Sequence, residues 1–170
     1  MVIVWFNGPS ARPFHHIPAQ SMEIGCNFIE RDRSVHHVCA FDQQTIERMS
    51  PRSATQYWTR RRFARDRWQL VDSKLPYYCS GTMAIALAIT LTREPIYVLG
   101  CDWGITNQSL YDTDYTWRQH QPMKMTQEKG QLMQRFCEQH PITFVHTEKR
   151  DRFGAVARWI GPREFLSLVQ

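Results

Sequence analysis

The chain has 170 residues, a length that suits one compact domain with its own core. Its hydrophobic fraction of 42% and aromatic fraction of 12% exclude wholesale disorder, and its longest apolar run, residues 83–91, is shorter than the roughly 20 residues of a membrane span. A net charge of +5 and a pI near 9.1 favour anionic partners such as phosphates, nucleotides, nucleic acid or anionic glycans.

The N-terminal apolar stretch has no Lys or Arg before it and no small-residue cleavage site after it, so we expect a first core strand and a cytoplasmic protein. The five cysteines form no C-x-x-C pair, which indicates reduced, buried thiols. The histidine pairs at 15–16 and 36–37 are adjacent in sequence, so the two members of a pair cannot face one metal from a regular element. We therefore expect no metal site of this kind.

Three short apolar runs, at residues 2–6, 22–28 and 35–41, predict strands that each end in a polar or turn segment. Between the first two, two prolines break residues 11–21 and leave room only for a short turn of helix. A helix is predicted over residues 42–49, because Asp42 is a good N-cap residue and Pro51 follows the segment.

Residues 57–68, YWTRRRFARDRW, interleave five arginines with aromatic residues. At helical spacing Trp58 and Phe63 share a face, which favours a solvated amphipathic helix. The alternative is a groove for nucleic acid or nucleotide phosphate, because guanidinium groups pair with phosphate and rings stack on bases. The candidate anion contacts are Arg60, Arg61 and Arg65.

The segment 77–104 predicts a helix–strand unit. An Ala-rich helix runs from Thr82 to about Thr92 after a Ser-Gly turn, and a buried strand follows at 96–99. The polar, aromatic residues up to Pro122 predict a functional loop. Beyond it the sequence predicts a helix at 125–140, a strand at 142–146 and a short helix at the end of the chain.

Strands that alternate with helices indicate a single α/β domain over residues 1–170. We expect a Rossmann-like, open, mostly parallel sheet with five recognisable strands and helices on both faces. Ligands of such sheets bind beyond the carboxyl ends of the strands, where the sequence places Asn7, Gly8, Asn27, Asp42 and Asp102.

The turn Asn-Gly-Pro-Ser at residues 7–10 directly follows the first strand. Glycine lets the backbone approach a ligand closely, and Ser10 stands beside amides that can hold a phosphate. These residues are also common in ordinary turns, and the segment has neither a Walker sequence nor a G-x-G-x-x-G fingerprint.

Three motifs in order carry a resemblance: NGPS after the first strand, GCNF at the end of the second, and SGTMAIALAITL leading to IYVLGCDW. Together, over about residues 2–111, they resemble the small bacterial sialyltransferases, whose donor is cytidine monophosphate-sialic acid. The same skeleton is similar to the hydroxymethylpterin pyrophosphokinase-like family.

The sialyltransferase resemblance implies a nucleotide-sugar donor, with a cytidine nucleotide favoured, and no other cofactor. It implies donor-binding roles for the phosphate, ribose, nucleoside and base. The residues that it assigns to them are Asn7, Gly8, Ser10, Asn27, Ser80, Gly81, Asp102 and Trp103.

The resemblance also implies two catalytic residues. Tyr111 matches the tyrosine that stabilises the departing nucleotide phosphate, and His120 is the candidate general base for the acceptor hydroxyl. A histidine suits that role because its pKa of about 6.5 lets it accept a proton near neutral pH. Around His120 the sequence departs from the family pattern, because its neighbours are Gln119 and Gln121.

Three functions remain open from the sequence. The first is a metal-independent glycosyltransferase that uses a nucleotide sugar. The second is a non-catalytic, viral accessory protein that binds nucleotide or nucleic acid through the arginine-rich segment. The third is a pyrophosphokinase-like transferase in which Asp42 and Asp102 hold Mg²⁺ between triphosphate oxygens.

Overall fold

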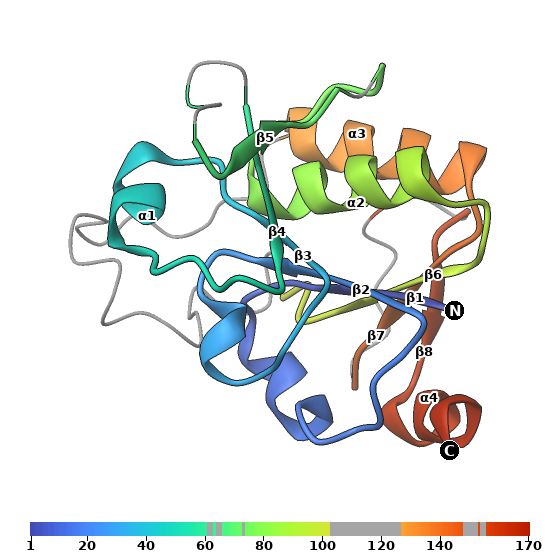
Figure 1. Ribbon diagram of the computed structural model, residues 1–170. Helices are drawn as coiled ribbons and strands as arrows, with labels where there is room; N and C mark the ends of the chain where they lie inside the picture. Colours follow the sequence, from blue (N-terminus) through green and yellow to red (C-terminus); the bar gives the residue numbers. More distant parts are fainter. Residues whose placement is uncertain (61–62, 64–65, 73, 103–126, 148–152, 154–155) are drawn as a thin grey trace.

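The computed structural model describes residues 1–60, 63, 66–72, 74–102, 127–147, 153 and 156–170. Its centre is one sheet of eight parallel strands in the order β5-β4-β3-β2-β1-β6-β7-β8 (Figure 1). The strands are β1 (Val2–Trp5), β2 (Met22–Cys26), β3 (His37–Cys39), β4 (Gln56–Thr59), β5 (Trp68–Leu70), β6 (Ile96–Leu99), β7 (Ile142–Val145) and β8 (Arg158–Ile160).

Helices cover both faces of the sheet (Figure 1). Helices α2 (Ser80–Leu91) and α3 (Gln127–Gln139) lie on one face, and η1 (Pro9–Phe14), η2 (Ile29–Arg31) and α4 (Pro162–Val169) lie on the other. The short α1 (Gln43–Arg48) links β3 to β4. This arrangement confirms the predicted open, Rossmann-like α/β sheet. Among the described residues, no helix combines the length and the apolar character needed to cross a bilayer.

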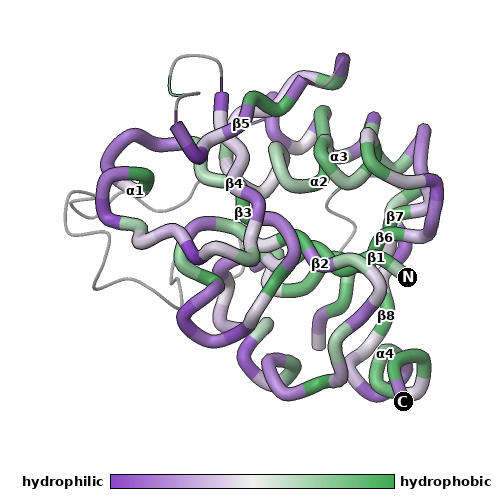
Figure 2. Tube along the Cα trace, in the orientation of Figure 1, coloured by the Kyte–Doolittle hydropathy of each residue, from purple (hydrophilic) through white to green (hydrophobic). Residues whose placement is uncertain are grey.

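The protein has two hydrophobic clusters, one on each face of the sheet, and β1 is buried on both faces. Val2 and Val4 face α2, whereas Ile3 and Trp5 face η1 and α4, as the two-residue period of a strand requires. Figure 2 shows the resulting hydrophobic centre along β1, β6 and β7.

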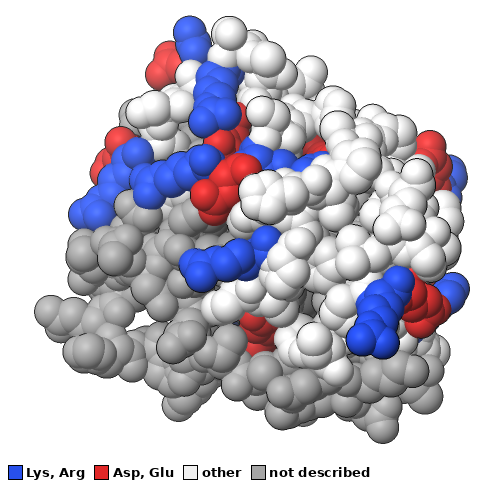
Figure 3. Space-filling model, turned by 90° about the horizontal axis from the view of Figure 1, so that it is seen from below, with Lys and Arg blue, Asp and Glu red and all other residues white. Residues whose placement is uncertain are grey.

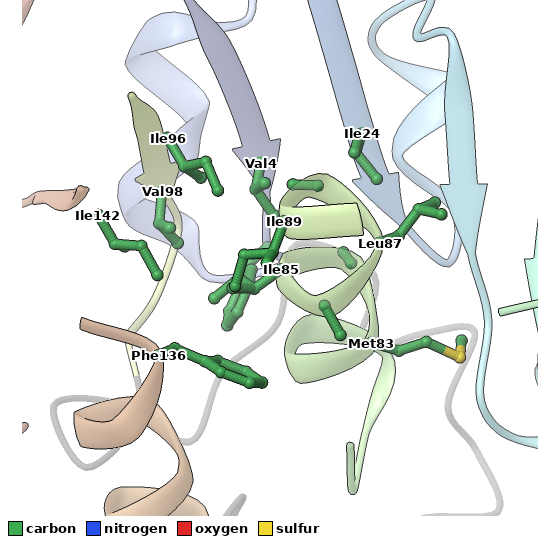
Figure 4. Packing of buried hydrophobic residues seen from close by; sticks show 14 of the residues in the cluster. Val4, Ile24, Met83, Ile85, Leu87, Ile89, Ile96, Val98, Phe136 and Ile142 are labelled. Carbon is green, nitrogen blue, oxygen red and sulfur yellow. The ribbon is translucent and has the colours of Figure 1, made fainter. Parts of the chain in front are cut away.

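Helix α2 is buried along most of its length, from Ser80 to Ile89. Its side chains pack on Val4 and Ile24 of the sheet, and Phe136 of α3 points toward it from the other side (Figure 4). A helix enclosed in this way must be apolar on every face, which explains the alternation of alanine with larger residues.

The connections place a topological switch between β1 and β6. The chain builds β1 to β5 outward in one direction, returns across the sheet through α2, and then builds β6 to β8 in the other direction. In open parallel sheets the crevice at such a reversal, beyond the carboxyl ends of the strands, is the usual ligand site.

Several predicted elements differ from the structure. The helix predicted within residues 57–68 is wrong: residues 57–59 belong to β4 and Trp68 begins β5. Tyr57 and Thr59 are buried while Trp58 between them is half-buried, so the alternation is that of a strand. Strand β8, which the sequence prediction missed, has only three residues and begins with the exposed Arg158.

The start of α2 also needs a correction. Ser80 and Gly81 were expected in a turn before the helix, but they form its first turn. The Thr82 hydroxyl accepts hydrogen bonds from the N–H groups of Tyr78 (2.9 Å) and Cys79 (3.1 Å). These bonds cap the helix, which therefore begins at Ser80, two residues earlier than predicted.

Candidate functional site

The turn after β1 is held tightly against the end of β6. The Gly8 N–H donates to the Gly100 carbonyl oxygen at 3.0 Å, and the Ala11 N–H donates to the Gly8 carbonyl at 3.0 Å. A Cβ atom on Gly8 would lie 2.3 Å from the Gly100 oxygen and 2.4 Å from Cγ of Asp102. Glycine is therefore needed here for close approach to protein, at the position where the sequence suggested close approach to a ligand.

Asp102 ties three strand ends together. Its Oδ2 accepts the Ser10 N–H at 3.0 Å and its Oδ1 accepts the Ser10 hydroxyl. His146, the residue after β7, places Nε2 3.4 Å from the same Oδ1. The carboxyl ends of β1, β6 and β7 thus meet at one carboxylate, which is 5% exposed.

The pKa of Asp102 reflects these contacts. Burial acts to raise it, but the hydrogen bonds from His146 and from the side chain and backbone of Ser10 outweigh burial and leave it below 3.8. Asp102 is consequently a charged acceptor at neutral pH, and its partners fix the turn at residues 7–10.

A second polar group joins the ends of β2 and β3 to the start of α2. The Phe41 N–H donates to Oγ of Ser80 at 3.1 Å, and the Ser80 hydroxyl donates to Oδ1 of Asn27 at 2.7 Å. We call these three residues the Asn27 relay. Asn27 has a φ of 52°, a left-handed conformation that asparagine tolerates better than most residues.

The Asn27 relay fixes the orientation of the carboxamide. The Ser80 hydroxyl accepts from the Phe41 N–H and donates to Oδ1 of Asn27, so the carboxamide oxygen faces Ser80. The Nδ2 group of Asn27 is therefore directed away from Ser80. In the first turn of α2, the Ser80 and Gly81 N–H groups have no acceptor within the helix.

Gly81 connects the Asn27 relay to β1. A Cβ atom on Gly81 would lie 2.5 Å from the ring of Phe6, the residue before Asn7. The first turn of α2 therefore packs directly against the end of β1. Asn7 itself is 9% exposed, and Asn27 is 4% exposed.

The structure thus brings several of the predicted site residues to one edge of the sheet. Gly8, Ser10 and Asp102 are in mutual contact, Asn27 and Ser80 share a hydrogen bond, and Gly81 lies against the residue before Asn7. Asp42 occupies the predicted N-cap position of α1, where its carbonyl accepts the Ile46 N–H at 3.1 Å. The predicted residues Trp103, Tyr111, His120, Arg61 and Arg65 lie outside the described residues.

His146 is the residue of this edge that the sequence analysis missed. The sequence placed it last in a predicted strand, which is a carboxyl-end position, but its contact with Asp102 depends on β7 lying beside β6. The position was a usable signal, whereas the partner could not be inferred without the strand order.

The cysteines and the charged surface residues give no further evidence for a site at this edge of the sheet. As predicted, Cys26, Cys39 and Cys101 are buried free thiols, while Cys79 and Cys137 are half-buried. In the ranges that the structure describes, no three His, Cys, Asp or Glu side chains gather as metal ligands. On the face seen in Figure 3, the coloured basic side chains are interspersed with acidic ones.

A scan of protein-family models finds no match to the chain, and searches of curated proteins and of solved structures find none either.

Proposed function

We propose that the chain binds a nucleotide at the carboxyl edge of β1, β2 and β6 and transfers a sugar from a nucleotide-sugar donor without a metal ion. The observation that carries the proposal is the Asn27 relay, which orients a carboxamide beside the first turn of α2 next to the topological switch.

The groups at this edge have the chemistry of a phosphate site. The N–H groups of Ser80 and Gly81 stand at the positive end of the dipole of α2, which favours an anion. The carboxamide of Asn27, whose oxygen accepts the Ser80 hydroxyl, lies next to these N–H groups. Backbone N–H groups of this kind donate hydrogen bonds to phosphate oxygens.

The contacts of Asp102 favour a metal-independent reaction over the pyrophosphokinase-like alternative. The Ser10 N–H, the Ser10 hydroxyl and His146 use three of about four acceptor positions on this carboxylate. A Mg²⁺ ion prefers oxygen ligands in near-octahedral geometry and would have to displace these donors. We therefore assign Asp102 to positioning the turn at residues 7–10.

The sugar transfer itself comes from the resemblance to the bacterial sialyltransferases. In the proposal Tyr111 stabilises the leaving nucleotide phosphate and His120 removes the proton of the acceptor hydroxyl. A cytidine nucleotide is the expected leaving group.

Thermal unfolding in the presence of nucleotides tests the proposal. A ligand at 100 times its dissociation constant adds about 2.7 kcal/mol to the free energy of unfolding. We expect cytidine 5′-monophosphate to stabilise the chain equally with and without Mg²⁺. Stabilisation by ATP only with Mg²⁺ would overturn it in favour of the kinase-like function, and tight, salt-dependent binding of oligonucleotides alone would favour the accessory role.

Asn27→Asp is the sharpest variant. It preserves the acceptor for Ser80 and the left-handed backbone but replaces the Nδ2 donors with a charged oxygen, so nucleotide binding should fall at least tenfold. The matched control is Gln131→Glu, the same chemical change on the exposed side of α3. Equal nucleotide affinity of the two variants would remove the Asn27 relay from the site.

A further inference from the structure

Arg60, the residue after β4, has an unusual environment. Its guanidinium carbon lies 4.3 Å from the ring centroid of Phe41 and 4.6 Å from that of Phe63. Its Nε atom is buried and has no hydrogen-bond partner. Among the described residues, no side-chain hydrogen bond or ion pair joins the Arg60 guanidinium to a partner, although the Arg60 backbone carbonyl accepts the Phe63 N–H at 2.9 Å.

This arrangement of the half-buried Arg60 differs from that of Arg33, which is buried. The guanidinium of Arg33 bonds both carboxylate oxygens of Glu23 and the carbonyl oxygens of His15, Ile17 and Pro18. Arg60 has stacking contacts, and none of the described residues supplies it with a carboxylate partner. Stacking on aromatic rings holds the plane of a guanidinium while its edge keeps the donor fork that matches phosphate or carboxylate.

Arg60 also stands beside the Asn27 relay. Phe41, whose ring lies under the Arg60 guanidinium, donates its own N–H to Ser80 Oγ. Tyr77, three residues before Ser80, packs edge-on against Phe41 with ring centroids 6.3 Å apart. Arg60, Phe41 and the start of α2 therefore form one continuous group at the carboxyl ends of β3 and β4.

We infer that Arg60 binds a second anionic group of the ligand whose first phosphate lies at Asn27 and the first turn of α2. This inference rests on the proposed nucleotide site and specifies its ligand as a nucleotide that carries a further phosphate or carboxylate. A diphosphate and a sugar acid linked to a monophosphate share that chemistry.

Isothermal titration with three probes tests the inference: cytidine 5′-monophosphate, cytidine 5′-diphosphate and cytidine monophosphate-sialic acid. The wild-type chain should bind at least one of the doubly anionic probes about tenfold more tightly than the monophosphate. The probe that gains affinity identifies the second anion as phosphate or as carboxylate.

In Arg60→Met, which preserves the apolar packing on Phe41 and Phe63, this preference should disappear while the monophosphate affinity stays within about twofold. Arg60→Lys should restore part of the preference, because it retains the charge without the planar fork. The control is Arg163→Met, which removes an exposed arginine from α4 and should leave all three affinities unchanged.

The outcomes separate this inference from the proposed function. If the wild-type chain binds the monophosphate and Arg60→Met retains the full preference for the doubly anionic probe, the role of Arg60 is wrong while the nucleotide site stands. If the wild-type chain binds none of the three probes, the nucleotide site fails and the role of Arg60 fails with it.

Discussion

At the scale of single residues, this fold depends on buried charged groups that protein donors satisfy. Glu23, 1% exposed, accepts from Arg33, from Trp5 Nε1 at 3.0 Å and from the Gln20 N–H at 2.8 Å. Asp102 likewise accepts a hydrogen bond from the Ser10 N–H and lies 3.4 Å from Nε2 of His146. Glu23 fastens the segment between η1 and β2, whereas Asp102 fastens the candidate site.

Removing one partner of the Glu23–Arg33 pair should be severe. We expect Arg33→Met to lower the free energy of unfolding by about 3–5 kcal/mol, because it leaves a buried carboxylate without its counter-ion. The double variant Glu23→Leu/Arg33→Met should lose less than the sum of the two single variants, as urea denaturation can measure. Strictly additive losses would mean that the two charges do not depend on each other.

Asp102 predicts an acid-dependent stability. Its folded pKa lies below 3.8, so its contribution is fully present above that value and is lost as the pH falls through the folded value. The difference in unfolding free energy between the wild-type chain and Asp102→Asn should therefore shrink as the pH falls from about 5 toward 2, where the carboxylate becomes protonated. A difference that grows on acidification would contradict the assignment of Asp102 as a charged acceptor.

At the scale of elements, the turn at residues 7–10 and the start of α2 are fitted to β1 by their glycines. Gly8 faces the Gly100 oxygen and Asp102, and Gly81 faces the ring of Phe6. Neither has room for a methyl group. Gly161, at the start of α4, has nothing within 4 Å of the corresponding position.

Alanine substitutions should reveal this difference. Gly8→Ala should cost about 2 kcal/mol or more, since backbone oxygen and a carboxylate must move to admit the methyl group. Gly161→Ala should cost no more than about 1 kcal/mol, because its extended backbone suits alanine and only the preference of the N-cap of α4 for glycine over alanine is lost. Similar losses for the two variants in chemical denaturation would show that the turn is not tightly packed.

The sequence was sufficient for the elements with a clear apolar pattern and insufficient for the short ones. The runs at 2–6 and 96–99 consist of apolar or aromatic residues, all of them buried except the half-buried Tyr97, so β1 and β6 could be predicted. At 57–68 the spacing of Trp58 and Phe63 among the arginines suggested an amphipathic helix, but all five arginines follow β4 in sequence, and the strand itself has only four residues. The contacts of His146 and Arg60 could not be predicted, since they depend on which strands are neighbours.

At the scale of the whole molecule, the order of the strands predicts that the central strands are better protected from solvent than the edge strands. β1 pairs with β2 and β6 and is buried on both faces, whereas β5 and β8 form the edges of the sheet. Central strands open only when the sheet unfolds, while edge strands can separate alone.

Amide hydrogen exchange should follow this grading. Peptides from β1 and β6 should exchange most slowly, with protection close to the global free energy of unfolding, and peptides from β5 and β8 should exchange faster. Nucleotide binding should slow exchange at the start of α2 more than in α4. Protection of β5 equal to that of β1 would contradict the edge position of β5.

The pairing of Val2 with Ile96 has a consequence for synthesis of the chain. As the protein leaves the ribosome, β1 can join β2 early, but its other side has no neighbour until β6 emerges after all of α2. A growing chain that pauses before β6 therefore exposes an apolar strand edge, which invites pairing with other nascent chains. The reversal of strand order between β1 and β6 thus also delays closure of the sheet until β6, at residues 96–99, has been made.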